Sequence, residues 1–169
     1  MVRRTLLTLL TSLGLARLAG AAPAGAAVSA GSAAPAGAIE PLRLSDTQWK
    51  QRLTPAQYRI LRQEGTEAPG SSALDREKRT GIYRCAGCEL PLFASSTKYD
   101  SGTGWPSFWQ PLPGAVRTKT DYKMILPRTE YHCARCEGHQ GHVFSDGPPP
   151  TGKRYCNNGL ALVFVADAG

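Results

Sequence analysis

Several features that would mark other protein classes are missing from this chain of 169 residues. No cluster of lysine and arginine follows residue 40, so the sequence pI of about 9.4 gives little indication of nucleic-acid binding. No apolar stretch approaches the roughly 20 residues that a membrane span needs. No long helical pattern separates the short β-like runs of the second half, which argues against parallel βαβ winding. The roughly 130 residues from about position 40 onward are enough for one domain with its own core.

Acidic residues are absent from the first 39 positions. Arg3 and Arg4 precede a leucine-rich stretch, which gives way to alanine, glycine and proline, and this is the layout of a signal peptide. The arginine pair loosely resembles a twin-arginine signal and predicts export to the periplasm. An organelle transit peptide, also basic and free of acids, is the alternative. We expect a signal peptide at 1–26, a flexible linker at 27–40 and the folded domain at 41–169.

The folded domain is predicted to begin with two short helices. Residues 45–48 and 54–57 both carry a capping-box pattern, and the second places proline at the first helical position. We expect the first helix to continue to residue 52. The second should end near residue 63, with Tyr58 and Leu61 facing inward.

Short β-like runs broken by glycine and proline follow residue 80. The last run, LALVFVA, is apolar throughout and predicts a central strand buried on both faces. The fold class expected is mainly β: a small antiparallel β domain of two sheets with two short N-terminal helices and a zinc-knuckle site. The predicted strands are 81–84, 90–95, 106–110, 116–120, 123–127, 130–133, 142–144 and 160–165.

The five cysteines comprise two Cys-x-x-Cys pairs and one residue left over, Cys156. The pairs are Cys85 with Cys88 and Cys133 with Cys136. Four thiolates at this spacing suit one tetrahedral, structural Zn²⁺. Two disulfides in an oxidising compartment, or a thioredoxin-type redox pair, are the alternatives. The equal spacing of the two pairs favours zinc.

The residues near Cys156 in the sequence indicate a reactive thiol. Arg154 and Asn158 alternate with it, so an extended backbone would place a guanidinium and an amide beside the sulfur. A cation favours the thiolate, which is the nucleophilic form. His139 and His142 lie upstream and are natural proton donors, although a His-x-x-His pair could also bind metal. The alternative for a lone cysteine in a strand is an inert core residue.

Three motifs, SGTGWPSF, GHQGHVFSDGPPPTG and KRYCNN, occur in one order together with the two cysteine pairs. In this combination the chain strongly resembles the B-type peptide methionine sulfoxide reductases over about residues 45–160. The resemblance implies reduction of methionine-R-sulfoxide in proteins, with Cys156 attacking the sulfoxide sulfur and becoming a sulfenic acid. It implies that His139, His142 and Asn158 assist protonation, that Arg154 holds the thiolate, and that Trp105 and Phe144 bind substrate.

The chain also departs from that family at particular positions. Thr103 stands where many relatives carry a resolving cysteine, so an external reductant, thioredoxin-like or another thiol, must attack the sulfenic acid directly. Gln140 and Asn157 stand where apolar residues are usual, and Gly159 replaces a small polar residue. The expected partners are oxidised protein or peptide and the thiol reductant, with no nucleic acid and a monomeric chain. A zinc-knuckle binding module is the competing hypothesis.

Overall fold

The computed structural model describes residues 39–123 and 125–168. The expected signal peptide at 1–26, and all of the expected linker except residues 39 and 40, lie outside this part of the chain. Within it, no helix has the length and hydropathy of a membrane-crossing segment.

Two helices open the described chain, as predicted: α1 (Asp46–Arg52) and α2 (Pro55–Gln63). Ser45 and Thr54 close complete capping boxes with Gln48 and Gln57, because each cap side chain accepts from the N3 backbone while the N3 amide oxygen accepts from the cap nitrogen. Helix α2 buries Ile60 and Leu61, whereas Tyr58 is partly exposed. Leu61 is thus buried as predicted, Tyr58 packs against the core while partly exposed, and Ile60 is a buried residue that the prediction did not name.

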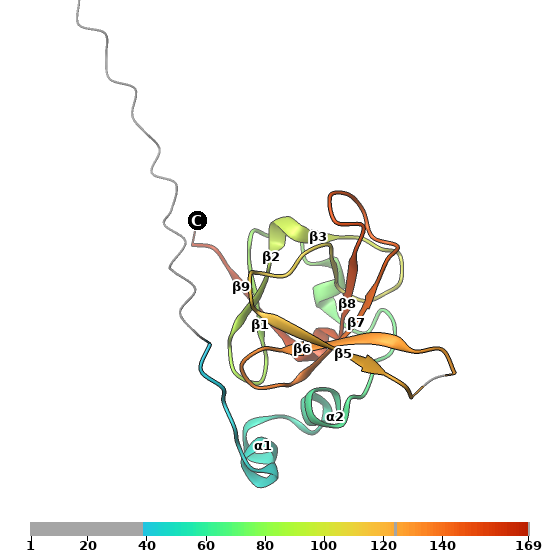
Figure 1. Ribbon diagram of the computed structural model, residues 1–169. Helices are drawn as coiled ribbons and strands as arrows, with labels where there is room; N and C mark the ends of the chain where they lie inside the picture. The colour runs from blue at the N-terminus through green and yellow to red at the C-terminus, as the bar shows by residue number, and fades with distance from the viewer. Residues whose placement is uncertain (1–38, 124, 169) are drawn as a thin grey trace, which may run out of the picture. The chain divides into compact units, whose positions relative to one another are not determined.

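All strands pair antiparallel in two sheets, which confirms the predicted fold class (Figure 1). The three-stranded sheet has the order β2-β1-β9 and the six-stranded sheet the order β3-β4-β8-β7-β6-β5. The first contains β1 (Gly81–Cys85), β2 (Pro91–Ala94) and β9 (Leu162–Ala166). The second contains β3 (Lys98–Tyr99), β4 (Ser107–Phe108), β5 (Val116–Asp121), β6 (Arg128–Cys133), β7 (His139–Phe144) and β8 (Arg154–Asn157). Three 3₁₀ turns complete the elements: η1 (Ala73–Arg76), η2 (Ser95–Thr97) and η3 (Gly159–Ala161).

Two strand predictions were wrong. In the segment 123–127, the described residues 123 and 125–127 are not in a strand and belong to the connection between β5 and β6. The final run is not a central strand either. Strand β9 pairs only with β1, so Val163 and Val165 lie on the open face at 44% exposure each. An unbroken apolar run therefore arose from an edge strand with one exposed face, which periodicity alone cannot distinguish from a buried strand.

An aromatic core joins the two sheets. Phe93 of β2 stacks on Phe108 of β4, with ring centroids 4.2 Å apart and planes 14° from parallel, and Tyr83 of β1 meets Phe108 edge-on at 4.9 Å. Tyr131 of β6 meets Phe93 at 6.1 Å. All four rings are buried, and each contributes about 1.5–3 kcal/mol by leaving water. This packing fixes β4, and with it the adjacent strand β8 that carries Cys156.

Candidate active site

Cys156 lies in a small cavity at the edge of the β7–β8 pair. The cavity has a volume of about 130 Å³, well below the several hundred cubic ångströms typical of sites for whole small molecules. It therefore suits the end of one side chain. The lining residues are Thr66, Trp105, Arg128, Gly141, His142, Phe144, Cys156, Asn157 and Asn158.

A row of chemically active side chains crosses the large sheet at this cavity. Cys156 of β8 is the direct partner of His142 on β7, and His142 is the direct partner of Glu130 on β6. On its other side Cys156 faces Ser107 of β4. Directly opposed residues share one face of a sheet, so thiol, imidazole, carboxylate and hydroxyl groups line up on a rigid surface. The sheet, rather than a loop, positions these groups.

The two histidines reach the same region because β7 is irregular. The pairing of β6 with β7 shifts register between Tyr131 and His132, so residues three apart approach with ring centroids 5.5 Å from each other. Gly141 permits this arrangement, since a Cβ at that position would lie 1.9 Å from the Cys156 carbonyl oxygen. The chain bends here through a bulge at which β7 and β8 approach closely.

His142 is oriented by a buried carboxylate. Its Nε2 lies 2.8 Å from Asp121 Oδ2, and Arg128 Nη2 donates to the same oxygen at 2.7 Å. A backbone hydrogen bond from Lys123, then the His142 contact, hold the pKa of Asp121 far below its usual range, so it is an ionised acceptor. Burial lowers the pKa of His142, so the ring is neutral near pH 7 with its proton on Nε2. Nδ1 is then free to accept a proton.

His139 does not line the cavity. It is 2% exposed and lies behind His142, with Nδ1 2.9 Å from Glu130 Oε1. The structure therefore brings only one of the two predicted histidines to the cavity wall. The other lies within the cluster that supports it.

The Cys156 thiol is subject to opposing influences. Burial raises its pKa, while the charge of Arg154 and a hydrogen bond from Thr103 act in the opposite direction, without cancelling the effect of burial. Arg154 does not line the cavity: it donates from Nε and Nη2 to Asp146 at 2.9 and 2.8 Å and covers the Phe144 ring at 4.3 Å. Its charge is thus shared with a carboxylate, and it supports the cavity wall through Phe144.

Asn158 lies just beyond β8 rather than on a continuous final strand. Its Nδ2 donates to the Gln140 carbonyl at 3.0 Å and its Oδ1 accepts from the Glu67 backbone nitrogen at 3.0 Å. The Trp105 indole donates to the Glu67 carbonyl at 3.2 Å. The segment around Glu67 therefore holds both Asn158 and Trp105 at the cavity.

The four remaining cysteines form a second cluster, all buried, with sulfur atoms within 4.8 Å of one another. Cys85 and Cys136 are 3.6 Å apart and Cys88 and Cys133 3.5 Å apart, too far for disulfides, whose bond is about 2.05 Å. A tetrahedron of sulfurs around a metal at about 2.3 Å has edges of about 3.8 Å. These residues could hold one metal ion, and the disulfide alternative is not formed.

A family model described as the SelR domain matches residues 53–166. The chain is 54% identical over 121 residues to "Peptide methionine sulfoxide reductase MsrB" of Agrobacterium fabrum, covering 71% of this chain and 90% of that protein. The chain belongs to the SelR family, the B-type peptide methionine sulfoxide reductases. It is also 56% identical over 120 residues to "Peptide methionine sulfoxide reductase B1, chloroplastic" of Arabidopsis thaliana, covering 70% of this chain and 59% of that protein. As a B-type reductase it acts on methionine-R-sulfoxide.

A solved structure of the Mis18 "Yippee-like" domain matches 54% of this chain and all of that chain, with a TM-score of 0.43 and 16% identity. A likeness at this level carries no conclusion about function.

Two departures from the usual B-type sequence form a single buried network. The Gln140 amide nitrogen lies 3.4 Å from Cys85 Sγ, and its oxygen accepts from Asn157 Nδ2 at 3.4 Å. Asn157 Oδ1 accepts from the Tyr131 hydroxyl at 2.6 Å. All three side chains are fully buried. Gln140 and Asn157 thus satisfy each other, because a buried amide alone would leave polar atoms unpaired.

Gly159 has a steric explanation. A Cβ there would lie 2.0 Å from Ser72 Oγ, and its backbone nitrogen donates to Glu67 Oε1 at 2.6 Å. The glycine lets η3 approach the segment before η1. A larger residue would force Ser72 away.

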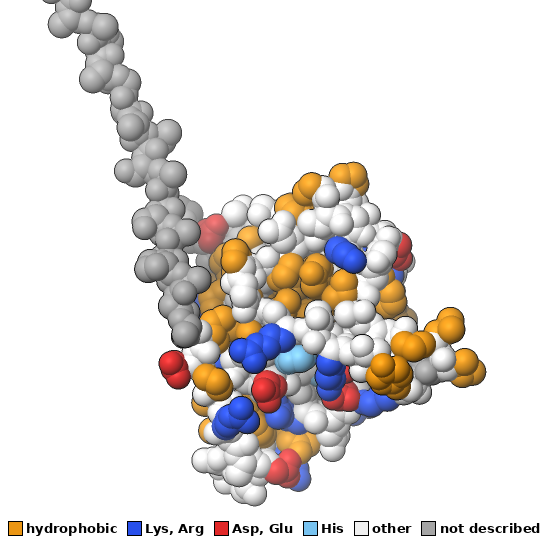
Figure 2. All heavy atoms as spheres, in the orientation of Figure 1, with side chains coloured by type: hydrophobic (Ala, Val, Ile, Leu, Met, Phe, Trp, Pro, Cys, Tyr) orange, Lys and Arg blue, Asp and Glu red, His pale blue; other side chains and the backbone are white. Residues whose placement is uncertain are grey.

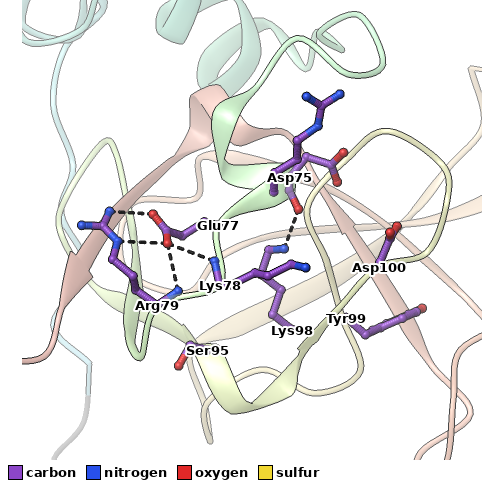
Figure 3. A pocket seen from close by; sticks show the side chains of 9 residues that line it. Asp75, Glu77, Lys78, Arg79, Ser95, Lys98, Tyr99 and Asp100 are labelled. Atoms are coloured by element: carbon purple, nitrogen blue, oxygen red, sulfur yellow. Dashed lines mark hydrogen bonds and ion pairs between the residues drawn. The ribbon is translucent and has the colours of Figure 1, made fainter.

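A larger cavity of about 540 Å³ lies between η1 and β3 (Figure 3). Its charged side chains face one another: Arg79 donates to both Glu77 oxygens, at 3.0 and 2.6 Å, and Lys98 donates to the Asp75 carbonyl at 2.6 Å. None of its lining residues is a cysteine or histidine. The smaller cavity, by contrast, is lined by both Cys156 and His142.

Sequence reasoning missed the acidic residues of the site. Asp121, Glu130 and Glu67 are all buried and contact His142, His139 and the η3 backbone respectively. Acids in a β-rich segment usually face solvent. The polar sequence of β6, RTEYHC, gave no signal that Glu130 is buried, because that burial follows from tertiary packing.

Proposed function

We propose that the protein repairs exported proteins by reducing methionine-R-sulfoxide through a sulfenic acid on Cys156. The observation that carries this proposal is the pairing of Cys156 with His142 on adjacent strands of one cavity. The cavity accepts the end of one side chain, and Trp105 and Phe144 supply apolar walls for a methyl group.

The chemistry balances as follows. The Cys156 sulfur attacks the sulfoxide sulfur, a proton reaches the sulfoxide oxygen, and the hydroxyl passes to Cys156 as methionine leaves. The sulfoxide gains two electrons, and the thiol becomes a sulfenic acid. Because burial keeps Cys156 protonated, the proton required by the oxygen is already present as the thiol proton.

We propose that His142 transfers that proton. Its neutral ring, held by Asp121 through Nε2, accepts the proton at Nδ1 as the thiolate forms. The resulting imidazolium, paired with a carboxylate, is the general acid for the sulfoxide oxygen. His139 and Glu130 support this ring from behind, and Asn158 contributes polarity at the cavity wall.

Regeneration requires an external thiol. The sequence holds no cysteine beyond Cys156 and the four-cysteine cluster, and Thr103 lies beside Cys156 in hydrogen-bonding position. A reductant thiolate attacks the sulfenic sulfur, water leaves, and a second thiol releases Cys156 from the mixed disulfide. A thioredoxin-like protein is the reductant class that we propose.

We propose Zn²⁺ as the metal of the four-cysteine cluster. Sulfur-only ligation and the observed spacing suit zinc. Four thiolates this close together would repel one another, so ionisation of the whole set needs a cation. Four sulfurs leave no open position, and the ion would hold the two turns together without entering the reaction.

Export is proposed from the first 26 residues, whose basic start, apolar middle and small-residue end fit a signal peptide. The repaired proteins would then be those outside the cytoplasm.

The experiment that tests the reaction is turnover of the two peptide-bound methionine sulfoxide epimers, measured separately with dithiothreitol. Reduction of the R epimer alone, with a sulfenic acid trapped on Cys156 by dimedone when reductant is withheld, is the expected result. Turnover without any trapped adduct on Cys156 would overturn the proposed intermediate.

A further inference from the structure

The connection between β5 and β6 exposes an unusual set of apolar side chains. Tyr122 is 76% exposed, Leu126 77%, and Ile125 fully. These are the most exposed large hydrophobic residues in the part of the chain that the structure describes. Figure 2 shows apolar side chains gathered at this projecting hairpin, at the right of the view. We call Tyr122, Ile125 and Leu126 the apolar tip. Contiguous exposed apolar surface on a small protein commonly marks an interaction site.

The apolar tip is continuous with the catalytic cavity. Asp121 and Arg128, which flank it in sequence, are direct cross-strand partners and form an ion pair at 2.7 Å. Asp121 contacts His142, and Arg128 lines the cavity. Arg128 therefore belongs to the cavity wall, and Asp121, its partner across the base of the hairpin, directly precedes Tyr122 of the tip. Because Tyr122 directly follows Asp121, the residues that flank a bound sulfoxide in an extended chain can run along this hairpin.

The base of the hairpin is held in place. Lys119 pairs with Glu64, the residue that ends α2, at 2.5 Å, and Lys123 pairs with the same carboxylate. These contacts, Lys119 first, lower the pKa of Glu64 to about 2. Charged side chains therefore fix the strands on one side, while the apolar side chains point away from any partner among the described residues.

We propose that the apolar tip is a docking surface for the substrate polypeptide, and that it selects extended segments with apolar residues near the oxidised methionine. Methionine is a core residue, so the residues that share its buried face, two positions away in a strand or three to four in a helix, are commonly apolar. Its oxidation makes the side chain polar and disrupts the core around it, which exposes those neighbours. The docking surface deepens the established activity at the cavity and rests on it.

The test compares two short peptides that carry one methionine-R-sulfoxide, one flanked by leucine and valine and the other by serine and glycine. The variant Tyr122→Ser/Ile125→Ser/Leu126→Ser is measured beside the wild type, in the full chain with zinc bound. We expect the wild type to prefer the apolar peptide, and the variant to lose about tenfold in kcat/KM for that peptide through KM. Turnover of the polar peptide should change less than about twofold.

The matched control is Val163→Ser/Val165→Ser, which removes exposed apolar side chains from β9, away from the cavity, and should change neither peptide. Equal losses for both peptides in the tip variant would indicate damage to Asp121 and Arg128 and would overturn the proposal. So would the absence of any preference in the wild type. A wild-type dimer that the tip substitutions dissociate would assign the surface to self-association instead. Polar-peptide turnover by the wild type separately reports whether the reductase reaction itself occurs.

Discussion

Cysteine has two roles in this protein, and the two environments differ in almost every respect. The cluster of four places each sulfur among three others in the core, where they can share a metal ion. Cys156 has no sulfur neighbour among these and lies half-buried in a cavity with a histidine opposite it. Grouping makes a thiol a structural ligand, whereas isolation beside a proton acceptor makes it a nucleophile.

The two cysteine environments are also physically connected. Gln140 reaches from Cys85 to Asn157, which directly follows Cys156, and the Gln140 carbonyl accepts from the Asn158 backbone nitrogen at 2.8 Å. A disturbance of the metal cluster can therefore alter the catalytic strand. The four-cysteine cluster and the Cys156 cavity thus differ in their chemistry but share one network of hydrogen bonds.

The largest effect is expected from breaking the metal cluster. In Cys133→Ser the fourth sulfur is lost, and zinc binding in comparable small sites is worth about 10–16 kcal/mol, more than most domains have in reserve. The variant should purify without zinc and lose its near-ultraviolet circular dichroism and its cooperative thermal transition. A folded, cooperative, metal-free variant would show that the cluster is dispensable.

Replacing the isolated cysteine should abolish activity and leave the zinc content and the fold intact, the opposite of the effect expected for Cys133→Ser. Cys156→Ser should abolish turnover, by at least about 10³-fold, because serine is not oxidised to a sulfenic acid equivalent. Zinc content and melting temperature should match the wild type, since Cys156 lies outside the cluster. Appreciable residual turnover in this variant would mean that another sulfur carries the reaction.

The reactivity of Cys156 should depend steeply on pH. Its pKa is raised by burial, so the thiol is protonated near neutrality and its alkylation by iodoacetamide should accelerate about tenfold per pH unit up to that pKa. Arg154→Ala removes a charge that lowers the pKa and should move the profile to higher pH. A plateau reached below pH 7 in the wild type would contradict this assignment.

The smallest effect concerns the link between the two cysteine environments. Gln140→Leu alone leaves the Asn157 amide and the Cys85 sulfur each with one hydrogen-bond partner fewer. It should lower the free energy of unfolding by about 1–3 kcal/mol. Gln140→Leu/Asn157→Val removes both amides and should be less destabilised than the two single losses added together. Chelator-driven zinc release should quicken in Gln140→Leu. Strict additivity, with unchanged release, would show that the amides act independently.

Local signals in the sequence were sufficient for part of the fold. The two capping boxes gave both helix starts, because the hydrogen bonds involved span only three residues. The β-rich second half followed from short runs between turns. By contrast, the exposure of Val163 and Val165 depends on which strands flank β9, and that is a property of the sheet order.

The candidate site shows the same division. Spacing and motif indicated the four-cysteine cluster and Cys156, since these depend on residue type and order. The burial of His139 behind His142, and the carboxylates of Asp121 and Glu130 beside them, came from a register shift and from strand pairing. Neither has a reliable local signature.

The sequence by itself determined which side chains are available: four paired cysteines, one solitary cysteine and no resolving partner for it. It also determined the family, through motifs that survive in order along the chain. Only the tertiary structure decided which histidine lies opposite Cys156, which acids hold the histidines, and how Gln140 connects the cluster to the cavity. These outcomes depend on contacts between residues far apart in the chain, whose geometry is set when the two sheets pack around the aromatic core.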